Sequence, residues 1–258
     1  MFESTDTECK KIVFITVGTT SFDPLINETL SKSFAKSCLI KFGPSVRVLI
    51  QIGRGIFSPP VYALNVKETI TDASSGEAIR WSFNIELSNT EMDMELKQCI
   101  TSSSSSSSSI TSSSTSSSYT NSLTNVIKKR KRIEISKDLV TLPIQVPYEI
   151  YRFKPNLMDD FKSATFVISH AGAGSVFEAL RLFKPLLVVI NPVLADNHQT
   201  ELADALSSVE GTGFGPHLQW CTPEKVTVSF STLDFEHLNP LPLSNLSRFT
   251  TALDRIVE

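Results

Sequence analysis

The stretch ATFVISHAGAGSVFEALRLFKPLLVVI (residues 164–190) decides the fold class. Residues 164–169 form a short apolar run typical of a buried strand, and residues 186–190 form a second one. Residues 174–183 between them are typical of a helix. A strand, a helix and a strand in so short a stretch predict a tight βαβ unit.

The N-terminal part predicts the same succession. Residues 11–17 (KIVFITV) are expected to form a buried strand, and residues 46–52 (VRVLIQI) another. After the turn Gly18-Thr19-Thr20-Ser21, a helix is expected to begin with Asp23 as N-cap and Pro24 at its first position. Its apolar stripe would comprise Leu25, Ile26, Leu30, Phe34 and Cys38. The fold class is therefore α/β.

The remaining elements are less evenly marked. From Pro59 the pattern weakens for some twenty residues, and residues 79–87 then alternate as a half-buried strand does. Order is expected again from Leu139, through residues 139–153, with a short helix over 156–161 and further helices over 197–206 and 244–257.

One segment reduces the foldable length well below 258 residues. Between Thr101 and Thr124, 20 of 24 residues are Ser or Thr, which cannot bury enough apolar surface to fold. We therefore expect one Rossmann-like domain over residues 11–258, interrupted by a disordered Ser-rich insertion at about 88–137. A two-domain enzyme is not expected from this length.

Charge and cysteine content restrict the function classes. Lys+Arg is 24 and Asp+Glu is 27; without the five basic residues 128–132 (KKRKR) the balance is 19 − 27 = −8. An acidic body argues against a nucleic-acid surface. The basic run fits a nuclear signal, a contact with anionic lipid or, as we favour, a solvated charge run. Four scattered cysteines, a polar N-terminus and no long apolar run indicate a soluble protein of a reducing compartment.

The candidate site begins with the loop Ser169-His170-Ala171-Gly172-Ala173-Gly174-Ser175 between strand and helix. Its glycines allow close approach of a ligand, and a helix N-terminus attracts a diphosphate. The alternative is an ordinary tight turn. The dinucleotide pattern GxGxxG is incomplete because Phe177 stands at the third glycine position.

Three further groups have both a functional and a structural interpretation. Glu178 either binds ribose hydroxyls or completes a capping box with Ser175. Asp196-Asn197-His198-Gln199 either contacts a sugar or caps a helix. The turn at 18–21 either supplies donors to the same cleft or is only a turn.

Four segments together resemble a known family. They are VFITVGTTSFDPLI (13–26), LIQIGRG (49–55), YRFKPNLMDDFKSATFVISHAGAGSVFEAL (151–180) and KPLLVVINPVLADNHQTELADAL (184–206). They resemble the cytosolic subunits of the eukaryotic UDP-N-acetylglucosamine transferase and, more distantly, the donor-binding half of the bacterial lipid-linked GlcNAc transferase.

The resemblance implies a fold equivalent to the donor-binding half of a GT-B glycosyltransferase. It implies transfer of GlcNAc from UDP-GlcNAc to GlcNAc-diphosphodolichol, with inversion and a β1,4 link, active only with a membrane-anchored, acceptor-binding partner subunit. That partner would recruit the cytoplasmic chain to the cytosolic face of the endoplasmic reticulum. The implied substrate-binding residues are Thr19, Thr20, His170, Gly172, Gly174, Ser175, Glu178, Asn197 and Gln199.

No catalytic residue is assigned, because the general base that inversion requires could come from the partner; His170 is the best-placed histidine of this chain. No cofactor or metal is expected, since Asp159-Asp160 lacks the spacer of a DxD motif. Two alternatives remain: a non-catalytic nucleotide-sugar-binding or regulatory subunit of this fold, and a Rossmann-type oxidoreductase, which the incomplete glycine pattern disfavours.

Overall fold

The computed structural model describes residues 10–73, 76–88, 144–191, 198–207 and 217–239. The Ser-rich insertion, apart from its first residue, and the helix expected over 244–257 lie outside the described residues.

The described strands form one eight-stranded sheet in the order β3-β4-β5-β2-β1-β6-β7-β8. The strands are β1 (Lys11–Thr16), β2 (Val46–Gln51), β3 (Ala63–Ala73), β4 (Gly76–Leu87), β5 (Ile144–Tyr151), β6 (Phe166–His170), β7 (Leu186–Val189) and β8 (Gln219–Cys221). The strands from β5 to β8 in this order are all parallel, whereas β3 and β4 pair antiparallel. Counted along the chain, the parallel strands follow the order 3-2-1-4-5-6, which is that of a Rossmann fold. The predicted Rossmann-like α/β class is confirmed.

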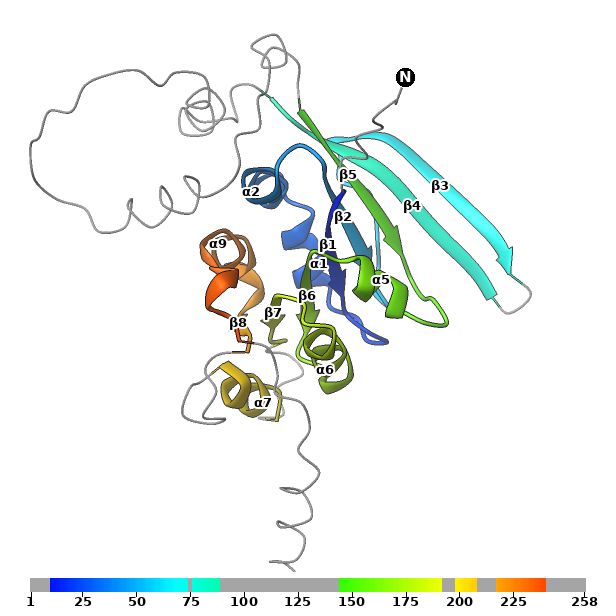
Figure 1. Cartoon of the computed structure of the whole chain (residues 1–258). Coiled ribbons are helices and arrows are strands. Elements are labelled where there is room, and N and C mark those ends of the chain that lie inside the picture. Colours follow the sequence, from blue (N-terminus) through cyan, green and yellow to red (C-terminus); the bar gives the residue numbers. More distant parts are fainter. Residues whose placement is uncertain (1–9, 74–75, 89–143, 192–197, 208–216, 240–258) are drawn as a thin grey trace, which may run out of the picture.

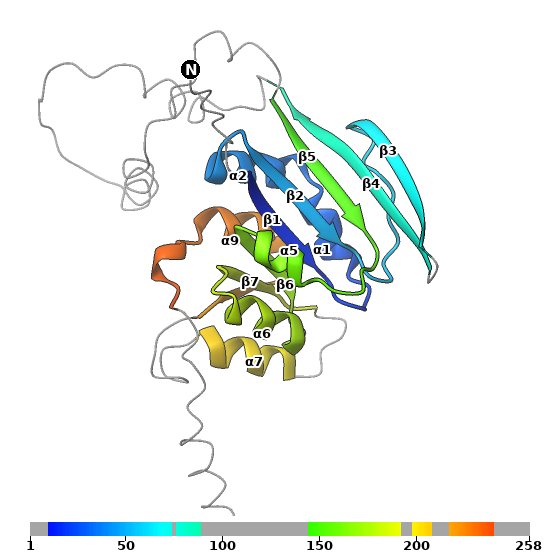
Figure 2. The same cartoon turned by 45° about the vertical axis from the view of Figure 1, so that its right-hand side comes forward.

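Helices cover both faces of the parallel part of the sheet (Figures 1 and 2). One face carries α1 (Asp23–Thr29), α2 (Lys32–Phe42) and α9 (Val226–Thr232), and the other carries α5 (Met158–Ser163), α6 (Ala173–Arg181) and α7 (His198–Ser207). Two 3-10 turns, η3 (Pro223–Lys225) and η4 (Phe235–His237), flank α9.

Burial on both faces explains why the parallel strands appear in the sequence as continuous apolar runs. On β1, Val13 and Ile15 point into the core beneath α1, α2 and α9, while Phe14 points into the core beneath α5, α6 and α7. The ring of Phe14 meets that of Phe161 of α5 edge to face at 5.1 Å between centroids. Both cores thus meet at the central strand.

The expectation of one helix across residues 23–38 is wrong, because the chain forms α1 and α2 with a break at Leu30–Ser31. Ser31 caps the second helix by accepting a hydrogen bond from the Phe34 amide at 3.1 Å. Asp23 is also not an N-cap: it is the first residue of α1, and Phe22 holds the cap position. The apolar stripe suggested a single helix because residues of both α1 and α2 pack on the same core.

An antiparallel hairpin extends the sheet beyond β5 (Figure 1). The second strand, β4, confirms the alternation at 79–87, but β3 was not predicted. Most of its visible side chains are exposed, Ile70 by 58%. A one-sided strand at the edge of a sheet lacks the apolar run that marks the inner strands. This hairpin lies between β2 and β5 in the chain, where Rossmann folds usually carry a crossover helix.

Lys41, in the last turn of α2, joins two helices of one layer. Its ammonium donates hydrogen bonds to the carbonyls of Phe230, Ser231 and Leu233 at the end of α9, at 2.6, 3.3 and 2.7 Å, and lies 4.5 Å from the centroid of the Phe235 ring. A cation at a helix C-terminus satisfies carbonyls that the helix itself leaves free.

We expect Lys41→Met to lower the free energy of unfolding by about 2 kcal/mol, because charged hydrogen bonds to partly buried carbonyls are lost. Denaturant titration of the full chain measures this loss. Lys67→Met, which alters an exposed lysine of β3, is the control. Equal stability of the two variants would contradict the role of Lys41.

Candidate functional site

The switch point of the strand order lies between β1 and β6. These neighbours run parallel, with Thr16 beside Ser169, and their chains leave toward opposite faces: β1 leads to α1 and β6 leads to α6. Ligands of open α/β sheets bind where the carboxyl ends of two such strands diverge. The structure therefore brings the predicted loops at Thr19–Thr20 and at His170–Ser175 to one point.

The imidazole of His170 lies between two glycines. A β-carbon placed on Gly18 would lie 2.7 Å from Cε1 of His170, and one placed on Gly172 would lie 2.3 Å from Nε2. Neither position has room for a larger residue. Gly172 is thus required by the His170 ring, although the sequence had been interpreted as leaving room for a ligand there.

His170 is held as a neutral, incompletely satisfied ring. Burial lowers the pKa of His170 below 6.5, and an interaction with the Thr16 backbone partly offsets this. Its Nδ1 is buried and has no hydrogen-bond partner in the part of the chain that the structure describes. At neutral pH the residue therefore offers polarity without charge.

The N-terminus of α6 is open beside His170. The helix begins at Ala173 with Gly172 as N-cap, and no described side chain caps it. The amides of Ala173, Gly174 and Ser175 precede Val176, whose amide bonds to the Gly172 carbonyl at 3.1 Å. Apart from Gly174 itself, its two chain neighbours and the adjacent α6 backbone, no described atom lies within 4 Å of a β-carbon placed on Gly174. Free amides, the helix dipole and open space form a site suited to a phosphate group.

The capping-box interpretation of Ser175 and Glu178 is wrong, because Gly172 is the N-cap and Ser175 is already the third residue of α6. Glu178 follows Gly174 by four residues, so the two share one side of the helix. Its side chain is half-buried. This leaves a carboxylate one turn beyond the open amides.

The first loop is fixed by its own hydrogen bonds. Gly18 has a φ of 63°, and the Thr20 hydroxyl donates to the Val17 carbonyl at 2.8 Å. Thr19 is exposed at the tip of the turn. Thr20 therefore shapes the loop, while Thr19 is exposed near the switch point.

The side chains of the predicted sugar-contacting pair, Asn197 and Gln199, are not described by the structure. Asn197 lies outside the described residues, and Gln199 is described only as part of the first turn of α7. The helix expected over 197–206 is present as α7, which the structure describes from His198 to Ser207.

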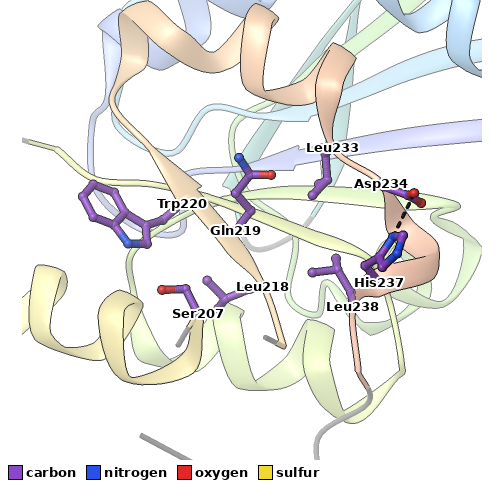
Figure 3. A pocket seen from close by; sticks show the side chains of 8 residues that line it. All are labelled: Ser207, Leu218, Gln219, Trp220, Leu233, Asp234, His237 and Leu238. Carbon is purple, nitrogen blue, oxygen red and sulfur yellow. Dashed lines mark ion pairs between the residues drawn. The ribbon is translucent and has the colours of Figure 1, made fainter. Parts of the chain in front are cut away.

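A separate hollow of about 390 Å³ lies at β8, the far edge of the sheet (Figure 3). Leu218, Trp220, Leu233 and Leu238 line it together with the ion pair of His237 and Asp234, whose Nδ1 and Oδ2 are 2.9 Å apart. It is distinct from the switch point. Its lining residues carry none of the predicted site.

Within the described ranges, no three His, Cys, Asp or Glu side chains are grouped so as to hold a metal ion. Among the helices that the structure describes, none is long and apolar enough to cross a membrane.

The depressed pKa of His170 predicts a pH-dependent stability. The unfolded chain binds a proton at His170 near pH 6.5, whereas the folded chain binds it only at lower pH. The contribution of His170 to the unfolding free energy is therefore full above pH 6.5 and decreases as the pH falls below it. We expect His170→Gln to flatten the dependence of the unfolding free energy on pH between about pH 5 and pH 7. His237→Gln, at an exposed histidine, is the control. Parallel curves for wild type and His170→Gln would contradict the prediction.

The sequence model of the "Glycosyltransferase family 28 C-terminal domain" matches residues 97–252, which is more than half of the 258 residues. The chain belongs to this family. The matched region includes α6 and the loop that precedes it.

Two relatives are named "UDP-N-acetylglucosamine transferase subunit ALG13". The Homo sapiens protein is 49% identical over 79 residues, which are 31% of this chain and 6% of that protein. The Saccharomyces cerevisiae protein is 36% identical over 89 residues, which are 34% of this chain and 41% of that protein. The matches therefore span less than half of each relative. A solution structure of ALG13 has a TM-score of 0.46 and 22% identity, with 95% of both chains covered.

Proposed function

We propose that this chain is the donor-binding subunit of a two-subunit UDP-GlcNAc transferase. The observation that carries the proposal is the open N-terminus of α6 at the switch point, with Gly174 facing open space and the Glu178 carboxylate on the same side of the helix. This arrangement accommodates a nucleoside diphosphate: the amides face the phosphates, and the carboxylate accepts hydrogen bonds from ribose hydroxyls. The family membership and the names of the relatives support a UDP-sugar as the occupant.

In the proposed reaction, a hydroxyl of GlcNAc-diphosphodolichol attacks the GlcNAc of UDP-GlcNAc, and UDP leaves with inversion to a β1,4 link. Hydrogen bonds from the amides of α6 and its dipole would stabilise the negative charge that develops on the leaving diphosphate. Asn197 and Gln199 would contact the sugar, and Thr19 and Thr20 would border the cleft.

The acceptor half is proposed to belong to a membrane-anchored partner at the cytosolic face of the endoplasmic reticulum. A GT-B site needs two Rossmann-like halves, whereas the described residues form a single sheet. The relatives are named as subunits, which supports a heteromeric enzyme. The general base is left to either subunit.

We expect Glu178→Ala to weaken UDP-GlcNAc binding by about tenfold to a hundredfold, because two ribose hydroxyls lose a charged acceptor. Isothermal calorimetry on the full chain, alone and with membranes that contain the partner, measures binding; sugar transfer to the dolichol-linked acceptor is assayed in parallel. Glu224→Ala, at an exposed carboxylate outside the site, is the control.

An unchanged affinity in Glu178→Ala would overturn the ribose role of this carboxylate. Failure of the wild-type chain to bind UDP-GlcNAc in either state would overturn the donor-site proposal. Donor binding with no transfer by the assembled complex would instead favour the non-catalytic, regulatory subunit.

A further inference from the structure

Gln51, the last residue of β2, lies beneath the candidate site and is not among the site residues expected from the sequence. Its side chain is almost completely buried, with 2% of the residue exposed. The signal was present in the sequence, since a polar residue interrupts the apolar run VRVLIQI near its end. Buried amides are retained where each polar atom finds a partner.

The carboxamide of Gln51 finds its partners at the ends of the two strands that flank β2. Its Oε1 accepts a hydrogen bond from the Thr16 hydroxyl, and its Nε2 donates to the carbonyls of Gly18 and Arg152, each at 2.7 Å. Thr16 ends β1, Gly18 lies in the first loop, and Arg152 follows β5. One side chain thus ties the carboxyl ends of three adjacent strands together.

Gly18 connects this network to the candidate site. Its amide donates to the Thr16 hydroxyl at 3.2 Å, and its carbonyl is held by Gln51. The His170 ring occupies the space where a β-carbon of Gly18 would lie, and also that of Gly172, the N-cap of α6. A displacement of the Gly18 carbonyl would therefore reach the ring and the open amides through direct contacts.

We propose that Gln51 is a positioning residue that holds the Val17–Ser21 loop against His170 and so shapes the anion site at the start of α6. It acts through Gly18 and touches no ligand itself. That the anion is the diphosphate of a UDP-sugar rests on the proposed function; the mechanical coupling of Gln51 to His170 does not.

The test compares two variants of the full chain that each lose hydrogen bonds to backbone carbonyls. Gln51→Met leaves the Gly18 and Arg152 carbonyls without their side-chain donor. Lys41→Met removes hydrogen bonds to three carbonyls at the end of α9. Lys41 lies in the last turn of α2, the helix that precedes β2, and therefore at the opposite end of β2 from Gln51. Both lower the stability, but only the first alters the loop at the switch point.

Two readouts separate positioning from stability. The first is the pKa of His170, followed by NMR on its Cε1–H; it should rise toward 6.5 in Gln51→Met, because a loosened loop admits water to the ring, and stay at the wild-type value in Lys41→Met. The second is the dissociation constant of UDP by calorimetry, expected to rise about tenfold in Gln51→Met alone, since small misplacements of binding groups are costly.

Equal readouts for Gln51→Met and Lys41→Met would overturn the proposal. If wild type binds no UDP but the His170 pKa moves only in Gln51→Met, the positioning role stands and the nucleotide function fails. If wild type binds UDP and neither readout changes in Gln51→Met, the function stands and the positioning role fails.

Should Gln51→Met not fold, Thr16→Val replaces it, with Thr16→Ser as the rescue that keeps the hydroxyl. An unchanged pKa of His170 in Thr16→Val would overturn the proposal.

Discussion

Gly53→Ala is expected to lower the free energy of unfolding by about 4 kcal/mol. Gly53 has a φ of 55°, which alone costs a residue with a β-carbon about 1–2 kcal/mol. A β-carbon would also lie 2.2 Å from the Thr20 carbonyl oxygen and 2.6 Å from that of Gly18. Both obstacles are backbone atoms, so no side chain can rotate away to relieve the contact.

The matched control for Gly53→Ala is Gly174→Ala, in which the same methyl group enters open space within a helix. This second change is expected to be neutral or to stabilise by up to about 1 kcal/mol, because alanine favours helices over glycine. Denaturant titration of both variants checks the contrast. A Gly53→Ala chain as stable as Gly174→Ala would refute the packing of the first loop against the β2 turn.

Asp160→Ala is expected to lower the free energy of unfolding by about 3 kcal/mol, because it removes the central acceptor of a buried polar cluster. Asp160, on α5, is 7% exposed and accepts hydrogen bonds from the Tyr151 hydroxyl at 2.5 Å and from the Lys154 ammonium at 2.7 and 2.8 Å. Burial, followed by the hydrogen bond to Asp160, raises the pKa of Tyr151, so the hydroxyl remains a donor. Without the carboxylate, the buried hydroxyl and the partly buried ammonium both lose their acceptor.

The neighbouring carboxylate provides the control for Asp160→Ala. Asp159 belongs to the same turn of α5 but is exposed, so Asp159→Ala should change the unfolding free energy by less than about 0.5 kcal/mol. Thermal and denaturant unfolding of both variants measures the difference. Similar losses in the two would show that burial of the cluster contributes little to stability.

The parallel core was predictable because its strands are buried on two faces, which leaves unmistakable runs such as KIVFITV and LLVVI. The hairpin strand β3 was not, because a strand at the sheet edge with exposed Ile70 and Lys67 follows no clear alternation. The break at Ser31 was missed for a related reason. The spacing of apolar residues indicates which face is buried, and the buried face continues from α1 to α2 across the break.

The site was predictable as a set of loops and not as a set of contacts. Strand ends of a parallel sheet meet at one edge, so the loops at Thr19 and Gly172 were expected to meet. The His170 ring fills the space beside Gly18 and Gly172. This depends on packing between segments 152 residues apart, which no local sequence pattern could indicate. The cap of α6 was misplaced because Ser175 has a side chain suited to capping, while the observed cap, Gly172, has none.

The pairing of β4 with β5 has a consequence for how freely the chain can change its length. Leu87 and Ile144 are cross-strand partners, so everything between them departs from and returns to a single rung of the ladder. That rung lies at the start of β5, and Tyr151 at the other end of the strand is about 23 Å away at 3.3 Å per residue. Closing such a loop costs only about 0.6 kcal/mol more for each doubling of its length. For protein engineering, this rung is therefore a suitable attachment point for a fluorophore or an affinity module, because it is remote from the switch-point end of the sheet.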